Sequence, residues 1–284
     1  MAFVTLKELM DKAEAGKYAV GAFNCNNMEI IQAIIQAAEA EKSPVIVQAS
    51  QGAIKYAGLS YIVAMTRLAA EEASVPVCLH LDHGTSFDQV MQCIRQGFSS
   101  VMIDGSKLEL EENIKLTNRV LDVARAVGVS VEAELGKIGG TEDDITVSEW
   151  EASMTDPEEA KTFVEQTGVD ALAVAIGTAH GQYKGTPKLD FERLAKIREL
   201  VPVPIVLHGS SGVPDDAIRK AVELGVRKIN IDTNIREAFV KGVNEVLAKN
   251  PNEIDPRKIL GPAKEKMTEI IREKIRLFGS GGKA

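Results

Sequence analysis

Short apolar runs rich in β-branched residues alternate with longer amphipathic stretches along the whole chain. Apolar runs of this length, bounded by turn residues, predict buried strands. The eight predicted strands are residues 18–24, 44–50, 76–83, 100–105, 130–135, 171–177, 204–209 and 228–232. Such short, continuous runs are typical of strands that are buried on both faces, as in a parallel sheet.

Between these runs, apolar residues recur at three- and four-residue spacing, which predicts amphipathic helices. The predicted helices are residues 28–41, 60–73, 86–97, 109–127, 157–167, 190–200, 214–224 and 234–248, with two more at about 5–15 and 262–277. Strict strand–helix alternation predicts a parallel sheet, and eight units favour a closed barrel. We therefore expect one (β/α)8 TIM-barrel domain over residues 1–284, with extra N- and C-terminal helices and a flexible tail at about 279–284.

The composition excludes some classes of partner. Hydrophobic residues make up 45% of the chain and charged residues 26%, which is ordinary for a globular protein with a sizeable core. The net charge of -8 argues against a nucleic-acid partner, because such proteins need a basic face. A small phosphorylated substrate stays compatible with this charge, since backbone N–H groups and a metal can hold it.

The sequence also carries no sign of a membrane or secretory segment. The first 20 residues lack a basic segment followed by an apolar run, and no stretch approaches 18 uninterrupted apolar residues. Cys25, Cys78 and Cys93 form no CxxC pair, so we expect buried thiols in a reducing compartment. These features predict a cytoplasmic protein with no membrane partner.

All four histidines fall near the ends of predicted strands, where the active site of such a barrel lies. A single histidine is usually structural, but four at one rim indicate a site. His83, His180 and His208 come from three different strands and can converge on a divalent ion, with one position left open for water or substrate. His80 lies deeper in its strand and is expected to be a hydrogen-bonded core residue.

Acidic residues accompany the histidines. Asp82 suits a proton donor to a substrate oxygen, or alternatively a carboxylate that only orients a histidine. Asp104 and Glu134 could hold a second metal position or could pair with nearby basic residues. Glu142 lies in the long segment of about residues 136–155, where an acidic run is by default a solvated turn.

Two segments are suited to phosphate. Residues 208–212 (HGSSG) follow the seventh predicted strand, and residues 230–234 (NIDTN) follow the eighth. In (β/α)8 barrels, backbone amides and a helix N-terminus at this place often bind phosphate. Gly181 and Lys184 add a turn and a cation for a second anionic group.

At these residues the sequence resembles the class II fructose-bisphosphate and tagatose-bisphosphate aldolases, and the resemblance runs almost end to end. Residues 77–84 (VCLHLDHG) resemble the first signature of the family, and residues 131–142 (VEAELGKIGGTE) resemble the second. Both motifs are long and specific. The resemblance implies a metal-dependent aldolase that needs no lysine Schiff base and acts in glycolysis and gluconeogenesis.

The resemblance also implies a role for each matching residue. It makes His83, His180 and His208 the Zn²⁺ ligands, Asp82 the group that protonates the aldehyde-side oxygen, and Glu142 the residue that moves the carbon-bound proton. Asp104 and Glu134 fit a second divalent position. The expected substrate-binding residues are Asn24, Ser50, Gly181, Lys184, Gly209, Ser210, Ser211, Asn230, Ile231, Asp232 and Thr233, with Ser50 at the second phosphorylated half. A monovalent cation could also take part.

The expected substrate is fructose 1,6-bisphosphate, which yields dihydroxyacetone phosphate and glyceraldehyde 3-phosphate. Residues 172–180 resemble tagatose-bisphosphate enzymes, whereas residues 230–234 look more like fructose-bisphosphate enzymes, so tagatose 1,6-bisphosphate stays an alternative. A zinc hydrolase and a non-catalytic partner subunit of an aldolase are more distant alternatives. Relatives of this kind suggest a homodimer or homotetramer. Arg257 is interpreted as part of a surface salt bridge, although it could reach a phosphate across a subunit interface.

Overall fold

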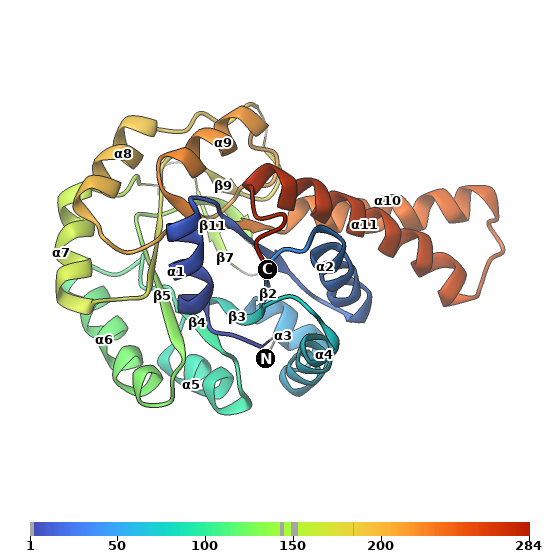
Figure 1. Ribbon diagram of the computed structural model, residues 1–284, viewed down its shortest axis with the longest axis horizontal. Coiled ribbons are helices and arrows are strands. Elements are labelled where there is room, and N and C mark those ends of the chain that lie inside the picture. The colour runs from blue at the N-terminus through green and yellow to red at the C-terminus, as the bar shows by residue number, and fades with distance from the viewer. Residues whose placement is uncertain (1–2, 143–144, 149–152, 184) are drawn as a thin grey trace.

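Eight parallel strands close into a barrel in the computed structural model, which describes residues 3–142, 145–148, 153–183 and 185–284. In order around the barrel they are β1 (Val20–Asn24), β2 (Val45–Ala49), β3 (Val77–Gly84), β4 (Ser100–Ile103), β5 (Ser130–Leu135), β8 (Ala171–Val174), β10 (Ile205–Leu207) and β11 (Val226–Ile231). The pairing of β11 with β1 closes the barrel. The predicted TIM barrel is therefore confirmed, and the helices ring it (Figure 1).

The helices over the described residues are α1 (Leu6–Gly16), α2 (Met28–Glu41), α3 (Gln51–Ala57), α4 (Leu59–Glu72), α5 (Phe87–Gln96), α6 (Leu110–Ala126), α7 (Pro157–Thr167), α8 (Phe191–Leu200), α9 (Asp215–Glu223), α10 (Thr233–Lys249) and α11 (Pro256–Phe278). Local signals explain their limits. The Asn27 side chain accepts a hydrogen bond from the N–H of Ile30 and so caps α2, while Ile30, Ile31 and Ile34 bury the apolar face of that helix.

Two expectations about the helices were incomplete. The C-terminal helix begins at Pro256 instead of residue 262, because the Asp255 side chain caps it and Pro256 occupies its first turn. Pro262 lies inside the helix. With this extra length α10 and α11 pack together as an arm that projects away from the barrel (Figure 1). The short helix α3, which Ser50 caps, was not predicted.

The long segment after β5 contributes two strands to a small second sheet. Its strands are β6 (Gly139–Glu142), β7 (Ile145–Val147) and β9 (Ala179–His180), and β6 pairs with both neighbours. The positive φ of Gly140 and its close approach to the backbone of His180 leave no room for a side chain at this position. This sheet therefore brings the long segment against His180, at the mouth of the barrel.

The C-terminal tail, residues 279–284, makes hydrogen bonds at the end of α2. The N–H groups of Gly282 and Ala284 donate to the carbonyls of Glu41 and Lys42. The Ser280 side chain is buried and lies 2.9 Å from the Ser43 hydroxyl. These contacts tie the tail to the end of α2, while residues 281–284 stay exposed.

The N-terminal end of the barrel is apolar and closed. Helix α1 packs its apolar face across this end against inward-facing strand residues. The buried cluster comprises Leu6, Leu9, Met10, Ala13, Tyr18, Val20, Ala22, Ile46, Cys78, Ala171, Ala173 and Val206. Cys25, Cys78 and Cys93 are buried free thiols, as expected. No helix within the described ranges is long and apolar enough to cross a membrane.

Candidate active site

The end of β3 turns two consecutive side chains into the mouth of the barrel. The pairing of β3 with β4 is irregular between Leu81 and Gly84, and His83 adopts a left-handed backbone with a φ of 48°. This region is costly for a residue with a side chain, and such strain is often found at functional sites. Asp82 and His83 are both buried there.

Three imidazoles converge at this mouth from β3, from β9 and from the end of β10. The ring centroids of His83 and His180 lie 5.0 Å apart, those of His83 and His208 4.8 Å, and those of His180 and His208 5.9 Å. One ligand atom from each residue lies within 4.8 Å of the others. The three histidines expected to share a metal ion are therefore brought together.

Carboxylates fix which nitrogen of two imidazoles carries the proton. His83 Nδ1 lies 3.0 Å from Asp104 Oδ2, and His208 Nε2 lies 2.9 Å from Glu132 Oε1. Because an ionised carboxylate only accepts hydrogen bonds, the protons sit on these outer nitrogens. When both rings are neutral and these outer nitrogens carry the protons, the inner nitrogens, His83 Nε2 and His208 Nδ1, face each other at 2.9 Å with their lone pairs.

A divalent cation bound by both inner nitrogens would remove the repulsion between their lone pairs. Burial lowers the pKa of His208 to about 4, so an extra proton between the rings is disfavoured at neutral pH. Neutral imidazoles that are oriented by carboxylates through their outer N–H groups are the usual ligand set of a catalytic zinc. The residues present therefore fit a divalent metal ion.

Asp104 and Glu134 form a second group of possible metal ligands with His83. Burial and the nearby charge of Asp104 raise the pKa of Glu134 well above its usual value. Burial opposes ionisation of Asp104 as well, but hydrogen bonds from His83 and Ser106 hold the pKa of Asp104 below its usual value. Glu134 Oε2 has no hydrogen-bond partner among the described residues. A cation at this place would offset the mutual repulsion of the two carboxylates.

Asp82 lies inside a cage of carboxamides. The side-chain amides of Asn24 and Gln48 donate to Asp82 Oδ2 at 2.9 and 3.0 Å, and that of Asn230 donates to Asp82 Oδ1 at 3.2 Å. Hydrogen bonds of this kind orient a buried carboxylate and stabilise its charge. Asp82 is therefore held beside His83 with both oxygens fixed in direction.

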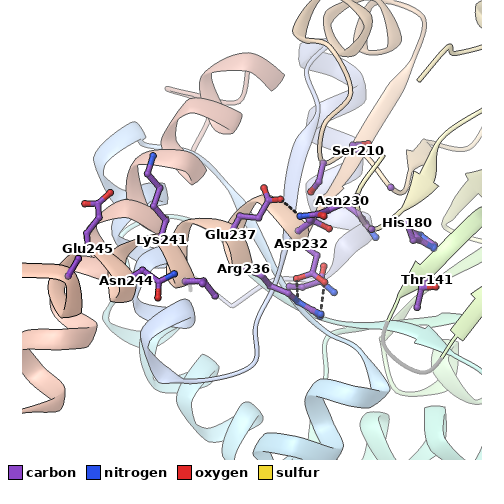
Figure 2. Close-up of a pocket in the computed structure, with 18 residues that line it drawn as sticks. Thr141, His180, Ser210, Asn230, Asp232, Arg236, Glu237, Lys241, Asn244 and Glu245 are labelled. Carbon is purple, nitrogen blue, oxygen red and sulfur yellow. Dashed lines mark hydrogen bonds and ion pairs between the residues drawn. The ribbon is translucent and has the colours of Figure 1, made fainter. Parts of the chain in front are cut away.

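A cavity of about 940 Å³ opens from this centre along α10. It is lined by Asn24, Thr141, His180, Gly181, Gln182, Gly209, Ser210, Ser211, Asn230, Asp232, Thr233, Arg236, Glu237, Val240, Lys241, Asn244, Glu245 and Ala248. Figure 2 shows His180, Asn230 and Ser210 toward its inner end and Lys241, Asn244 and Glu245 on α10. Most of the expected substrate-binding residues thus share one cavity.

Of the remaining expected residues, Ile231 and Ser50 do not line this cavity. The Ile231 side chain packs into the hydrophobic core and does not line the cavity, because alternation along β11 turns it away from the barrel interior. Ser50 is 4% exposed and accepts a hydrogen bond from the N–H of Ala53. Lys184 lies outside the described residues, as does the side chain of Glu142, whose backbone pairs with Ile145.

Several residues at the site were not assigned from sequence. Gln48 donates to Asp82, Glu132 accepts from His208, and Arg236 pairs with Asp232 at 2.7 Å. Strand alternation could have placed Glu132 inward, two residues before Glu134. His80 is the buried core residue that was expected, with Nδ1 2.8 Å from the Ser100 hydroxyl.

Comparison with known proteins identifies the family of the chain. Residues 4–283 match the family model described as fructose-bisphosphate aldolase class-II. The chain is 50% identical to a fructose-bisphosphate aldolase of Thermus caldophilus, over 99% of both chains, and 50% identical to one of Geobacillus stearothermophilus, over 100% of this chain and 99% of the other. The crystal structure of the YdjI aldolase from Escherichia coli K12 superposes with a TM-score of 0.87, at 35% identity and 99% coverage of each chain. The chain therefore belongs to the class II fructose-bisphosphate aldolase family.

Proposed function

We propose that the protein catalyses the reversible aldol cleavage of fructose 1,6-bisphosphate to dihydroxyacetone phosphate and glyceraldehyde 3-phosphate, with Zn²⁺ held by His83, His180 and His208. The observation that carries the proposal is the pair of imidazole nitrogens facing each other at 2.9 Å beside Asp82. Family membership supports the reaction class. The ligand set is inferred from the convergence of the three rings.

The metal, when bound, supplies a Lewis acid that polarises the substrate carbonyl and stabilises the negative charge that develops on oxygen. The protein supplies the proton transfers. In the cleavage direction Asp82 takes the proton of the hydroxyl group that becomes the aldehyde, and in the synthesis direction it returns that proton. We assign the transfer of the carbon-bound proton to Glu142, which the family resemblance suggests.

Substrate binding is assigned to the cavity beside these groups. Gly209 has a positive φ of 61° and approaches the backbone of Ala179, so a side chain there would clash. Ser210 and Ser211 follow it, and their backbone N–H groups are proposed to bind one phosphate. Asn230, with Asp232 and Thr233 at the start of α10, completes this half of the site.

Further parts of the proposal concern the second metal position and the assembly. Asp104 and Glu134 are proposed to bind a second divalent ion, as their unfavourable proximity suggests. We also propose that the enzyme is a homo-oligomer, a dimer or a tetramer. Arg257 pairs with Asp255 at 2.8 Å on the surface of this chain, which matches the salt bridge interpreted from the sequence.

The direct test is cleavage of fructose 1,6-bisphosphate and, in parallel, tagatose 1,6-bisphosphate by the purified protein. Each sugar is assayed untreated, after treatment with a chelator, and after zinc is added back. We expect chelator-sensitive cleavage that zinc restores, with the fructose sugar cleaved faster. Faster cleavage of the tagatose sugar would change the assigned substrate. No cleavage of either sugar by the zinc-loaded protein would reject the aldolase proposal and favour a hydrolase or a partner subunit.

A further inference from the structure

Lys228 on β11 is a lysine in an unusual place. Its side chain has 0% exposure and points into the barrel, and it is the only lysine among the fully buried side chains of the described residues. A buried ammonium group is unfavourable unless it is paired and hydrogen-bonded. Lys228 Nζ lies 3.0 Å from Glu132 Oε2 and 2.8 Å from Asn230 Oδ1.

The first of these contacts leads to a proposed metal ligand. Glu132 Oε2 faces Lys228, and Glu132 Oε1 lies 2.9 Å from His208 Nε2. Glu132 is also 0% exposed, so Lys228 is the cation that offsets its buried charge. The ion pair therefore fixes the position of the carboxylate that turns the other ring nitrogen of His208, Nδ1, toward His83.

The second contact leads to Asp82. Asn230 Oδ1 accepts from Lys228 Nζ, and Asn230 Nδ2 donates to Asp82 Oδ1 at 3.2 Å. An amide can be turned over without changing its shape, so its partners decide which end faces which group. Because an ammonium group only donates, Lys228 requires the oxygen of Asn230 on its own side and so turns the amide N–H groups toward Asp82.

We propose that Lys228 is a positioning residue for both halves of the active site, acting through Glu132 on His208 and through Asn230 on Asp82. This inference rests on the proposed function, since it concerns the zinc ligand and the proton carrier assigned there. One buried cation thereby sets the orientation of two groups that must act on the same substrate.

Stability alone is a weak explanation for this arrangement. A buried ion pair can often be replaced by apolar residues of similar volume at little loss of stability. The inward-facing residues nearer the N-terminal end of the barrel, such as Ile46 and Val206, are indeed apolar. The buried charges of Glu132 and Lys228 instead contact His208 and Asn230.

The test compares three variants of the full-length protein with the wild type. Lys228→Met keeps most of the side-chain volume and removes the charge. The double variant Glu132→Gln with Lys228→Met removes both charges together and leaves an amide oxygen that can accept from His208 Nε2. Ile46→Val is the matched control, a small change inside the barrel within the apolar cluster that α1 covers. Zinc affinity is measured by competition with a chromophoric chelator, and kcat and KM are measured at saturating zinc.

The contacts through Glu132 and the contacts through Asn230 predict different changes in zinc affinity and kcat. Lys228→Met should weaken zinc binding and should lower kcat at saturating zinc, each on the order of 10-fold or more. The double variant should bind zinc nearly as tightly as the wild type but keep the reduced kcat, because Asn230 still lacks its ammonium donor. Ile46→Val should change neither quantity. If Lys228→Met does not fold, the double variant, in which neither Glu132 nor Lys228 leaves an unpaired charge, is used instead. Its kcat alone then tests the inference.

Zinc affinity and kcat within twofold of the wild type in Lys228→Met would overturn the inference. Losses that Ile46→Val shares equally would also overturn it, because they would reflect general loosening of the barrel. Wild-type kcat in the double variant would reject the part played by Asn230. A failure of this inference can be distinguished from a failure of the proposed function. Cleavage by the zinc-loaded wild type tests the function, and the ratios of zinc affinity and kcat between the variants and the wild type test the role of Lys228.

Discussion

The two ends of the barrel are built from the same strands but differ in how well their polar groups are satisfied. At the N-terminal end α1 covers apolar residues, and Glu14 accepts from Arg198 at 2.6 Å and pairs with Arg227 at 3.1 Å. At the C-terminal end two imidazole nitrogens face each other, and two carboxylates, Asp104 and Glu134, lie close together. The first end contributes stability, whereas the second carries the residues that we propose bind the metal and the substrate.

The largest expected difference between the ends concerns catalysis. His208→Ala should abolish tight zinc binding and lower kcat/KM about 10³-fold or more, because the Lewis acid contributes several kcal/mol to transition-state stabilisation. Zinc content after dialysis and the rate of cleavage test this expectation. Retained zinc at one ion per chain would contradict the assignment of His208.

A substitution at the opposite end should have the reverse effect. Leu9 is 1% exposed in the cluster beneath the barrel, so Leu9→Ala should lower the free energy of unfolding by about 2–5 kcal/mol. Denaturant unfolding of the zinc-loaded protein measures this loss, and kcat at 25 °C should stay near that of the wild type. A proportionate loss of kcat would show that the two ends are not separable.

The imidazole at the mouth should make the metal-free protein sensitive to acid. The pKa of His208 is lowered by burial to about 4 in the folded state, against about 6.5 in the unfolded chain. The unfolded state therefore binds the proton first, and the unfolding free energy should fall by roughly 3 kcal/mol as the pH falls from 6.5 to 4. Unfolding curves of the chelator-treated wild type and of His208→Asn isolate this contribution as their difference. Identical pH dependence in the two proteins would refute it.

The smallest expected effect is a gain in stability. Glu134 is buried near Asp104, and its pKa is raised well above the usual value by burial and by that neighbouring charge. Glu134→Gln should therefore stabilise the metal-free protein at pH 7 by about 1 kcal/mol, as is common when a strained functional group is removed. Thermal unfolding with chelator measures the gain, and Glu14→Gln at the other end is the matched control, which should lose stability instead. A loss in Glu134→Gln would remove the contrast between the ends.

Most of the barrel could be predicted because its strands are short apolar runs and its helices are amphipathic. The period of the apolar pattern differs between the two elements, so it located all eight barrel strands and, apart from α3, the helices between them. The pattern failed where local partners decide the structure. Asp255 and Pro256 start α11 earlier than its apolar pattern does, because the Asp255 side chain caps the helix.

The parts of the candidate site that could be predicted are those whose residue types stand out in the sequence. Histidines at strand ends pointed to His83, His180 and His208, and the structure brings them together. Lys228 and Gln48 were missed. A lysine or glutamine within an apolar strand is usually interpreted as a solvent-exposed position, and only the closed barrel places these two side chains in its interior. Their roles depend on contacts between strands, such as Lys228 with Glu132, and no local pattern encodes such a contact.

The measurement that tests the central claim most directly is anomalous diffraction at the zinc edge from crystals of the zinc-loaded protein. The account predicts a peak about 2.0–2.1 Å from His83 Nε2, His208 Nδ1 and a ring nitrogen of His180. A strong zinc peak elsewhere, with these three imidazoles unbound, would contradict the account.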